Sequence, residues 1–157
     1  MTDSPLANPL KLPCGAVLLN RIAKAAMTEG LADAQLHATR RHETLYRRWS
    51  EGGAGLLITG NVMIDHRVLE RPGNVAIDPA PAEGEPEAMA QLRAWAEAGT
   101  SNGNHLWMQI SHAGRQSPRY VTSRPMGPSA VQLSLMGNYA RPRALTEPEI
   151  LDFIQRF

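Results

Sequence analysis

The sequence predicts an α/β fold built on a parallel sheet, and two observations carry this prediction. Short apolar segments alternate with amphipathic ones, in the order strand, helix, strand, helix, strand and the beginning of a third helix, which is typical of right-handed parallel crossovers. Each predicted strand also ends in small or polar residues, at the edge where parallel α/β folds hold their chemistry. With 157 residues, the chain has room for one domain with a core but is short for two.

Composition and charge narrow the class of protein. Hydrophobic residues make up 43% and charged residues 20% of the chain, which indicates a soluble globular protein rather than a disordered or membrane one. The net charge of +1 provides no field that would attract nucleic acid or an anionic membrane. The chain shows neither a secretory signal pattern nor a membrane span, so a cytoplasmic location is expected. Cys14, the single cysteine, excludes an intrachain disulfide and is expected at the surface.

The first third of the chain predicts a hairpin and a strand. Residues 9–20 combine short apolar pieces with proline, glycine and asparagine, which predicts a small hairpin that caps one end of the fold. Residues 21–27 follow as the first buried strand, although their alanines suit a helix equally well by propensity. Residues 28–30 then form a polar turn.

The middle of the chain predicts a helix, a strand and a loop. Residues 37–51 form the helix, with Ala38, Leu45 and Trp49 on one face and a glycine pair as its stop. Residues 54–58 form a compact apolar strand that ends in Thr59-Gly60-Asn61. Prolines and glycines within residues 62–84 predict a long surface loop.

A second helix and a third strand follow. The helix begins near Glu85-Pro86 and directs Met89, Leu92 and Trp95 toward the core. Residues 105–116 then turn from apolar to polar, and the apolar part predicts a strand buried on both faces. Its apolar residues are Leu106, Trp107, Met108 and Ile110, and its polar ones are Gln109, Ser111, His112 and Arg115.

The last part of the chain predicts a long connection and the beginning of a helix. Residues 117–143 are rich in proline and glycine, and so long a structureless connection is typical of a functional lid or excursion. Residues 146–149 read Thr-Glu-Pro-Glu, a capping box. The helix continues in an apolar stripe that needs a further strand or another chain to bury it. The stripe consists of Ile150, Leu151, Ile154 and Phe157.

If the three strands are parallel neighbours, their ends line one mouth suited to a flat ligand with polar edges. Ala26 and Gly60 are small enough for a ring to approach the backbone, while Thr28 and Gln109 offer hydrogen bonds. Each residue also fits an ordinary structural role. Gln109 is compatible with a bond to a neighbouring loop, and Thr28 with a turn or a helix cap.

Other common sites have no motif in this chain. The spacing of His37 and His42 fits a shared helix face poorly, and neither an HExxH motif nor a pair of cysteines is present. A nucleophile elbow, a phosphate-binding loop and a GxGxxG fingerprint are also missing. The sequence therefore predicts no metal site, and its motifs give no signal of nucleotide binding.

Five blocks of sequence, taken together, resemble the old yellow enzyme family of FMN-dependent NAD(P)H oxidoreductases. The resemblance extends from about Pro9 to the last residue, in the order and spacing of the family. The blocks are residues 20–28 (NRIAKAAMT), 51–60 (EGGAGLLITG), 109–116 (QISHAGRQ), 127–130 (GPSA) and 145–150 (LTEPEI).

The resemblance implies a (β/α)8 TIM barrel with a short N-terminal hairpin across its bottom. Residues 1–157 would be the N-terminal part of a single FMN-binding domain, covering about the first three βα units and truncated in the third helix. By resemblance, Ala26, Met27 and Thr28 would contact the flavin ring, with the Thr28 hydroxyl near the C4 oxygen. Gly60 would offer a backbone contact and Gln109 would bond the pyrimidine portion, while His112 is kept structural.

The reaction implied by the resemblance passes a hydride from NAD(P)H to FMN and then to an activated alkene such as an enone. The histidine pair that polarises the acceptor in the family would lie beyond Phe157, so the isolated chain is expected to be a poor enzyme. Two alternatives remain open. One is a non-catalytic half-barrel that assembles with another chain or with itself as a homo-oligomer, and the other is a small open-sheet binding module unrelated to flavins.

Overall fold

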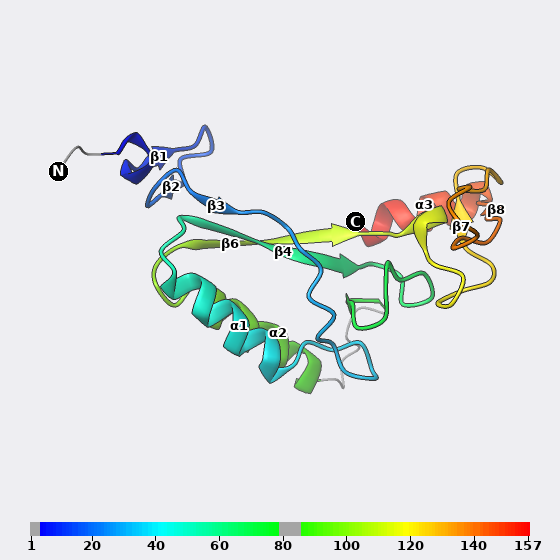
Figure 1. The fold of residues 1–157 in the computed structure, drawn as a ribbon, viewed down its shortest axis with the longest axis horizontal. Coiled ribbons are helices and arrows are strands. Elements are labelled where there is room, and N and C mark those ends of the chain that lie inside the picture. Colours follow the sequence, from blue (N-terminus) through cyan, green and yellow to red (C-terminus); the bar gives the residue numbers. More distant parts are fainter. Residues whose placement is uncertain (1–3, 79–85) are drawn as a thin grey trace.

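A computed structural model describes residues 4–78 and 86–157, and its centre is a four-stranded sheet (Figure 1). The strands are β3 (Ala23–Lys24), β4 (Leu56–Met63), β5 (Val75–Ala76) and β6 (His105–Ser111). β4 pairs in parallel with each of the other three. The prediction of a parallel sheet is confirmed, and the carboxyl ends of β3, β4 and β6 point the same way.

Helices α1 (Arg40–Glu51) and α2 (Pro86–Gly99) lie side by side against one face of this sheet (Figure 1). The rings of Tyr46 and Trp95 meet edge to face at 5.2 Å between their centroids, a favourable geometry for aromatic pairs. Aromatic and aliphatic side chains from both layers thus form one core. Its buried members are Ala38, Tyr46, Leu57, Val62, Val75 and Trp95.

The predicted helix faces are partly right. Ala38 is buried and Trp49 packs against the core, but Tyr46, which the sequence analysis did not single out, is the aromatic side chain at the centre. In α2, Trp95 is buried as predicted, whereas Met89 is 48% exposed. Met89 lies in the first turn of α2, where its neighbour Ala88 is the buried residue.

Helix α1 begins at Arg40 rather than at residue 37. Asp33 accepts hydrogen bonds from the backbone N–H groups of Gln35 and His37, which holds the preceding residues in a turn. The Thr39 N–H then donates to Nδ1 of His42 at 3.0 Å, in a capping box. Local side-chain bonds therefore move the boundary that periodicity alone placed earlier.

Strand β4 is longer than predicted, so the prediction of a loop over residues 62–84 is wrong at two places. Val62 and Met63 continue β4, and Val75–Ala76 form the short strand β5 beside them. Val62 and Val75 are both buried. They pack in the core, which residues of a surface loop would not do. Residues 79–85 of the predicted loop lie outside the described residues.

Strand β6 begins at residue 105 as predicted, but it is not buried on both faces. Trp107 and Met108 are each 44% exposed. β6 pairs only with β4, so among the described residues its other edge has no neighbour. The apolar composition of β6 was read correctly, but burial depends on neighbouring strands and helices, and in the described part of the chain β4 is the one strand that pairs with β6.

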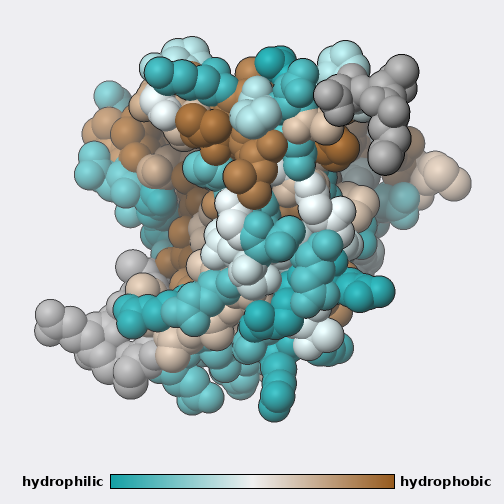
Figure 2. Space-filling view, turned by 90° about the vertical axis from the view of Figure 1, so that its left-hand side faces the viewer, coloured by the Kyte–Doolittle hydropathy of each residue, from teal (hydrophilic) through white to brown (hydrophobic). Residues whose placement is uncertain are grey.

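The N-terminal hairpin is confirmed as a cap at the end of the sheet where the strands begin. Strand β1 (Leu10–Lys11) pairs antiparallel with β2 (Val17–Leu18), and the 3-10 helix η1 (Pro5–Ala7) precedes them. The Asn20 side chain donates to the Gly53 carbonyl at 2.7 Å, which ties the hairpin to the start of β4. Figure 2 looks at this end of the molecule and shows hydrophobic residues among hydrophilic ones in its upper part, and a largely hydrophilic surface in its lower part. Cys14 is exposed, as expected.

The segment predicted as a structureless connection contains short elements. The 3-10 helix η2 (Gly114–Gln116) leads into it, and β7 (Met126–Gly127) pairs with β8 (Arg143–Ala144). Helix α3 (Glu147–Arg156) then begins at the predicted capping box, in which the Thr146 N–H donates to Glu149 at 2.9 Å. Within the described ranges, every helix is too short or too polar to cross a membrane.

Candidate functional site

The segment that follows β3 touches β4 at Gly60, which lies inside β4 rather than after its end as the sequence predicted. A Cβ atom at this position would lie 2.7 Å from the Cα atom of Thr28 and would also overlap the Met27 carbonyl oxygen. Only glycine fits so close an approach between two backbones. The structure therefore brings Gly60 together with Met27 and Thr28, as the sequence analysis predicted.

A carboxylate holds this junction from the side of the helices. The Gly60 N–H donates to Oε1 of Glu29 at 3.0 Å, and the Tyr46 hydroxyl donates to the same oxygen. Burial raises the pKa of Tyr46, and its hydrogen bond to Glu29 raises it further, so the phenol remains a neutral donor. Sequence reasoning missed both roles. The only available signals were the position of Glu29 directly after Thr28 and of Tyr46 one turn before Trp49.

Lys24 also links the segment after β3 to β4. Its ammonium donates to the carbonyl oxygens of Ala25 and Ile58, at 2.9 Å each. The ammonium also lies 4.3 Å from the centre of the Trp49 ring, a cation–π contact. Burial lowers the pKa of Lys24, while the negative charge of Glu29 opposes that shift. The segment after β3 is thus bound to β4 by a charged group on either side of the crossing.

Gln109 joins the site from β6. The register of the β4–β6 pair shifts between Ile58 and Asn61, so β4 carries one extra residue at this point, a β-bulge. The bulge directs the Thr59 hydroxyl to the Gln109 N–H at 2.9 Å. The Gln109 side chain donates from Nε2 to Oδ1 of Asn61 at 2.6 Å. Its partner is therefore the adjacent strand rather than a loop, and Asn61 is a site residue that sequence reasoning missed.

Ala26, Met27 and Thr28 have side-chain surface that a ligand could contact. Met27 is 56% exposed and Ala26 is half-buried. Within residues 4–78 and 86–157 the Thr28 side chain makes no hydrogen bond, so the alternative role of Thr28 as a cap is not supported. Small, apolar and hydrogen-bonding groups thus lie together at one sheet edge, an arrangement that can accept a flat ring with a polar edge.

His112 has the contacts of a structural residue. Its Nδ1 accepts the Gly114 N–H at 3.1 Å, and its ring packs on Phe153 of α3 at 4.6 Å between centroids. Its Nε2 lies 3.8 Å from Asp65. Burial opposes the charge on Asp65, but the nearby His112 and Arg67 outweigh it and hold the pKa of Asp65 well below its usual range. His112 thus links the end of β6 to α3 and to the loop after β4.

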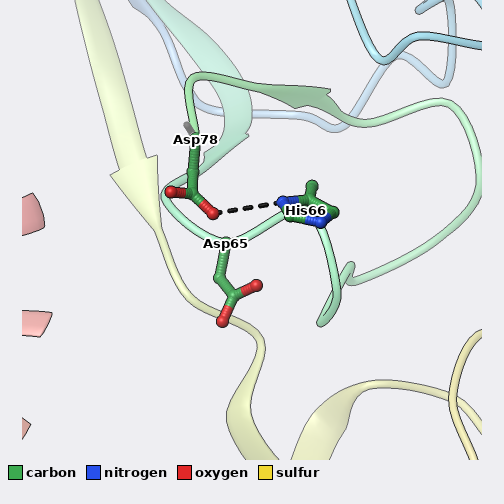
Figure 3. A group of neighbouring side chains, drawn as sticks. All are labelled: Asp65, His66 and Asp78. Atoms are coloured by element: carbon green, nitrogen blue, oxygen red, sulfur yellow. Dashed lines mark hydrogen bonds and ion pairs between the residues drawn. The ribbon is translucent and has the colours of Figure 1, made fainter. Parts of the chain in front are cut away.

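One group of side chains resembles a metal site by proximity alone. Potential ligand atoms of Asp65, His66 and Asp78 lie within 4.8 Å of one another (Figure 3). However, Arg67 forms a bidentate pair with Asp65, and Arg156 pairs with Asp78. Because each carboxylate already has a cation, the group is an ion-pair network. A cavity of about 350 Å³ lies beside it, and its lining contains none of the predicted site residues.

The fold and these strand ends define a class of protein, a partial (β/α)8 barrel whose functional edge is the carboxyl end of its strands. The structure of an old yellow enzyme homologue from Zymomonas mobilis superposes with a TM-score of 0.81 at 24% identity, covering 98% of this chain and 43% of that one. The likeness confirms the barrel fold that the sequence predicted.

Sequence comparisons define the family. A family model described as NADH:flavin oxidoreductase / NADH oxidase matches residues 5–157, and the chain belongs to this family. It is 38% identical to the NADH-dependent flavin oxidoreductase nadA of Aspergillus parasiticus, over 98% of this chain and 37% of that protein. It is 34% identical to the NADH-dependent flavin oxidoreductase iliE of a Neonectria species, over 93% of this chain and 19% of that protein. The chain thus spans less than half the length of these relatives.

Proposed function

We propose that residues 1–157 are the N-terminal part of a single FMN-binding TIM-barrel domain. The whole domain would pass a hydride from NADH or NADPH, through FMN, to an activated alkene such as an enone. The observation that carries the proposal is the crossing of Gly60 and the Met27–Thr28 backbone at the mouth of three parallel strands, with Gln109 beside it. Family membership supports the cofactor class.

The residues present fit such a cofactor. The space that a Cβ atom of Gly60 would fill is occupied by Met27, Thr28 and Glu29, and Glu29 also accepts the Gly60 N–H. Gly60 thus holds the Met27–Thr28 backbone against β4, and a ring would meet that backbone. Ala26 and Met27 would contact the ring, and the unpaired hydroxyl of Thr28 would donate to the C4 oxygen. Gln109 would bond the pyrimidine portion. FMN supplies the hydride chemistry when bound, and the chain orients the ring.

We further propose that the isolated chain is a poor enzyme. Turnover needs a group that polarises the acceptor as well as groups that orient the ring, and we assign no such catalytic group to residues 1–157. In relatives more than twice as long, other parts of the barrel are available to hold the acceptor and the FMN phosphate. Binding of FMN and turnover should therefore separate in this chain.

The test is to purify the chain, titrate it with FMN and follow the flavin absorption and fluorescence. Oxidation of NADPH or NADH in the presence of cyclohexenone is then measured. We expect a spectral shift with little turnover. The Gly60→Val variant should lose binding by about 100-fold or more, because its side chain would overlap Thr28. Robust turnover by the monomer contradicts the second proposal, and an unchanged flavin spectrum contradicts the first.

A second candidate function, a half-barrel that assembles with another chain or with itself, is favoured by exposed apolar surface. Met108 and Trp107 of β6 are each 44% exposed. An apolar groove of about 400 Å³ also lies along α3, and it is lined by Pro128, Leu145, Ile150, Phe153, Ile154 and Phe157. Size-exclusion chromatography with light scattering separates the two states. A stable dimer supports assembly, and a monodisperse monomer contradicts self-assembly.

A further inference from the structure

We propose that Asn61 is a further cofactor-positioning residue, which pairs with Gln109 to recognise the imide edge of the flavin pyrimidine ring. The inference rests on the proposed FMN binding and adds a residue and a recognition rule to it. The carrying observation is the hydrogen bond from Gln109 Nε2 to Asn61 Oδ1, 2.6 Å long, across the β4–β6 pair.

Both side chains lie on the face of the sheet opposite the helices. Val62 and Leu106 pack in the core with α1 and α2. Since side chains alternate along a strand, Asn61 precedes Val62 on the other face, and Gln109 lies three residues after Leu106 on that same face. The two residues are direct partners in the register. Their amides therefore meet on the face that α1 and α2 leave open.

The bond between the two amides fixes the direction of each. A primary amide has one carbonyl oxygen and an NH₂ group. Because the Gln109 Nε2 and the Asn61 Oδ1 face each other, the Gln109 Oε1 and the Asn61 Nδ2 are left for a ligand. Within the described part of the chain, neither of these two atoms has a hydrogen-bond partner. The pair thus offers one acceptor and one donor.

This pattern matches an imide, in which a ring N–H lies between two carbonyl groups. The Gln109 Oε1 would accept the ring N3–H, and the Asn61 Nδ2 would donate to an adjacent carbonyl oxygen. Without Asn61, the Gln109 amide can rotate by half a turn and present its NH₂ group to the ring N–H, which would place two donors together. Asn61 therefore acts by holding Gln109 in the accepting orientation and by adding one donor.

The test compares FMN with its N3-methyl analogue, which lacks the ring N–H. We expect the parent chain to bind FMN at least tenfold more tightly than the analogue, because the methyl group removes one hydrogen bond and clashes with Gln109. In Asn61→Leu this ratio should fall to about threefold or less. Asn61→Asp keeps an oxygen for Gln109 Nε2 but loses the donor, so FMN affinity should fall by about tenfold or more while the preference for FMN over the analogue remains.

A matched control is Asn138→Leu, since Asn138 is exposed in the loop before β8 and should leave the ratio unchanged. The side-chain NH₂ resonances of Gln109 provide a readout without ligand. They should be resolved and slow to exchange in the parent and in Asn61→Asp but not in Asn61→Leu, which also reports whether the sheet remains folded.

The outcomes separate this inference from the function on which it rests. Failure of the parent to bind FMN overturns both. Binding of FMN with the same ratio in the parent and Asn61→Leu overturns only the role of Asn61. If Asn61→Leu does not fold, Asn61→Asp decides, because unchanged FMN affinity in that variant contradicts the donor role.

Discussion

Strands β4 and β6 are neighbours of similar apolar composition, yet they lie in different surroundings. β4 is paired on both edges and covered by α1 and α2, and Leu57 near its start is 1% exposed. β6 is paired on one edge, and Met108 at its centre is 44% exposed. An apolar run thus identifies a strand, but its burial is decided by elements elsewhere in the sequence. The loss in unfolding free energy when a residue is truncated should therefore depend on these surroundings.

The largest expected difference is between Leu57→Ala in β4 and Met108→Ala in β6. Leu57→Ala leaves a cavity inside the helix-covered core and should lower the free energy of unfolding by about 3 kcal/mol. Met108→Ala removes a side chain that is already half in water, so we expect about 1 kcal/mol or less. Urea unfolding followed by circular dichroism measures both. Equal losses would show that β6 is buried in solution, by self-assembly for example.

The next comparison concerns the hydroxyl group that holds the strand ends. Tyr46→Phe leaves Glu29 without one of its donors at a buried position, and should cost about 1 to 3 kcal/mol of unfolding free energy. Tyr120→Phe is the matched control, because Tyr120 is 73% exposed and should change stability by less than about 0.5 kcal/mol. If the proposed site is correct, Tyr46→Phe should also weaken FMN binding, because Glu29 positions Gly60.

The pH dependence of stability should come from the covered side of the sheet. Burial of His42 lowers its pKa, helped by Arg41 and opposed by Glu29, so the native state favours the neutral ring that accepts the Thr39 N–H. The unfolded chain binds the proton more readily. Stability is therefore fully present above the unfolded pKa of about 6.5 and is lost as the pH falls below it.

His42→Gln tests this origin, because glutamine at the same position can complete a capping box without titrating. Thermal unfolding between pH 7.5 and 5.5 should show a falling melting temperature for the parent and a flatter profile for the variant. Parallel profiles would assign the effect to another group.

These comparisons also explain which parts of the fold and site were predictable. The hairpin, α2 and the α3 capping box follow from local signals, and the structure confirms them. Gly60 and Gln109 were placed at one edge because parallel strands bring their carboxyl ends together. Asn61 and Glu29 were missed because their roles depend on the β4 bulge and on a hydroxyl from α1, which no short sequence pattern encodes.

The smallest effect is expected on the outer face of α1. Arg40, Arg41, Arg47 and Arg48 are exposed there, and the Arg48–Glu51 pair is 3.8 Å apart with side chains 83% and 54% exposed. Because water screens such pairs, Glu51→Gln should change the free energy of unfolding by less than about 0.5 kcal/mol. Urea titrations at low and high salt would measure it. A loss above about 1 kcal/mol would mean that the outer face of α1 is covered in solution. The exposed surface of the molecule would then not be limited to the side of β6.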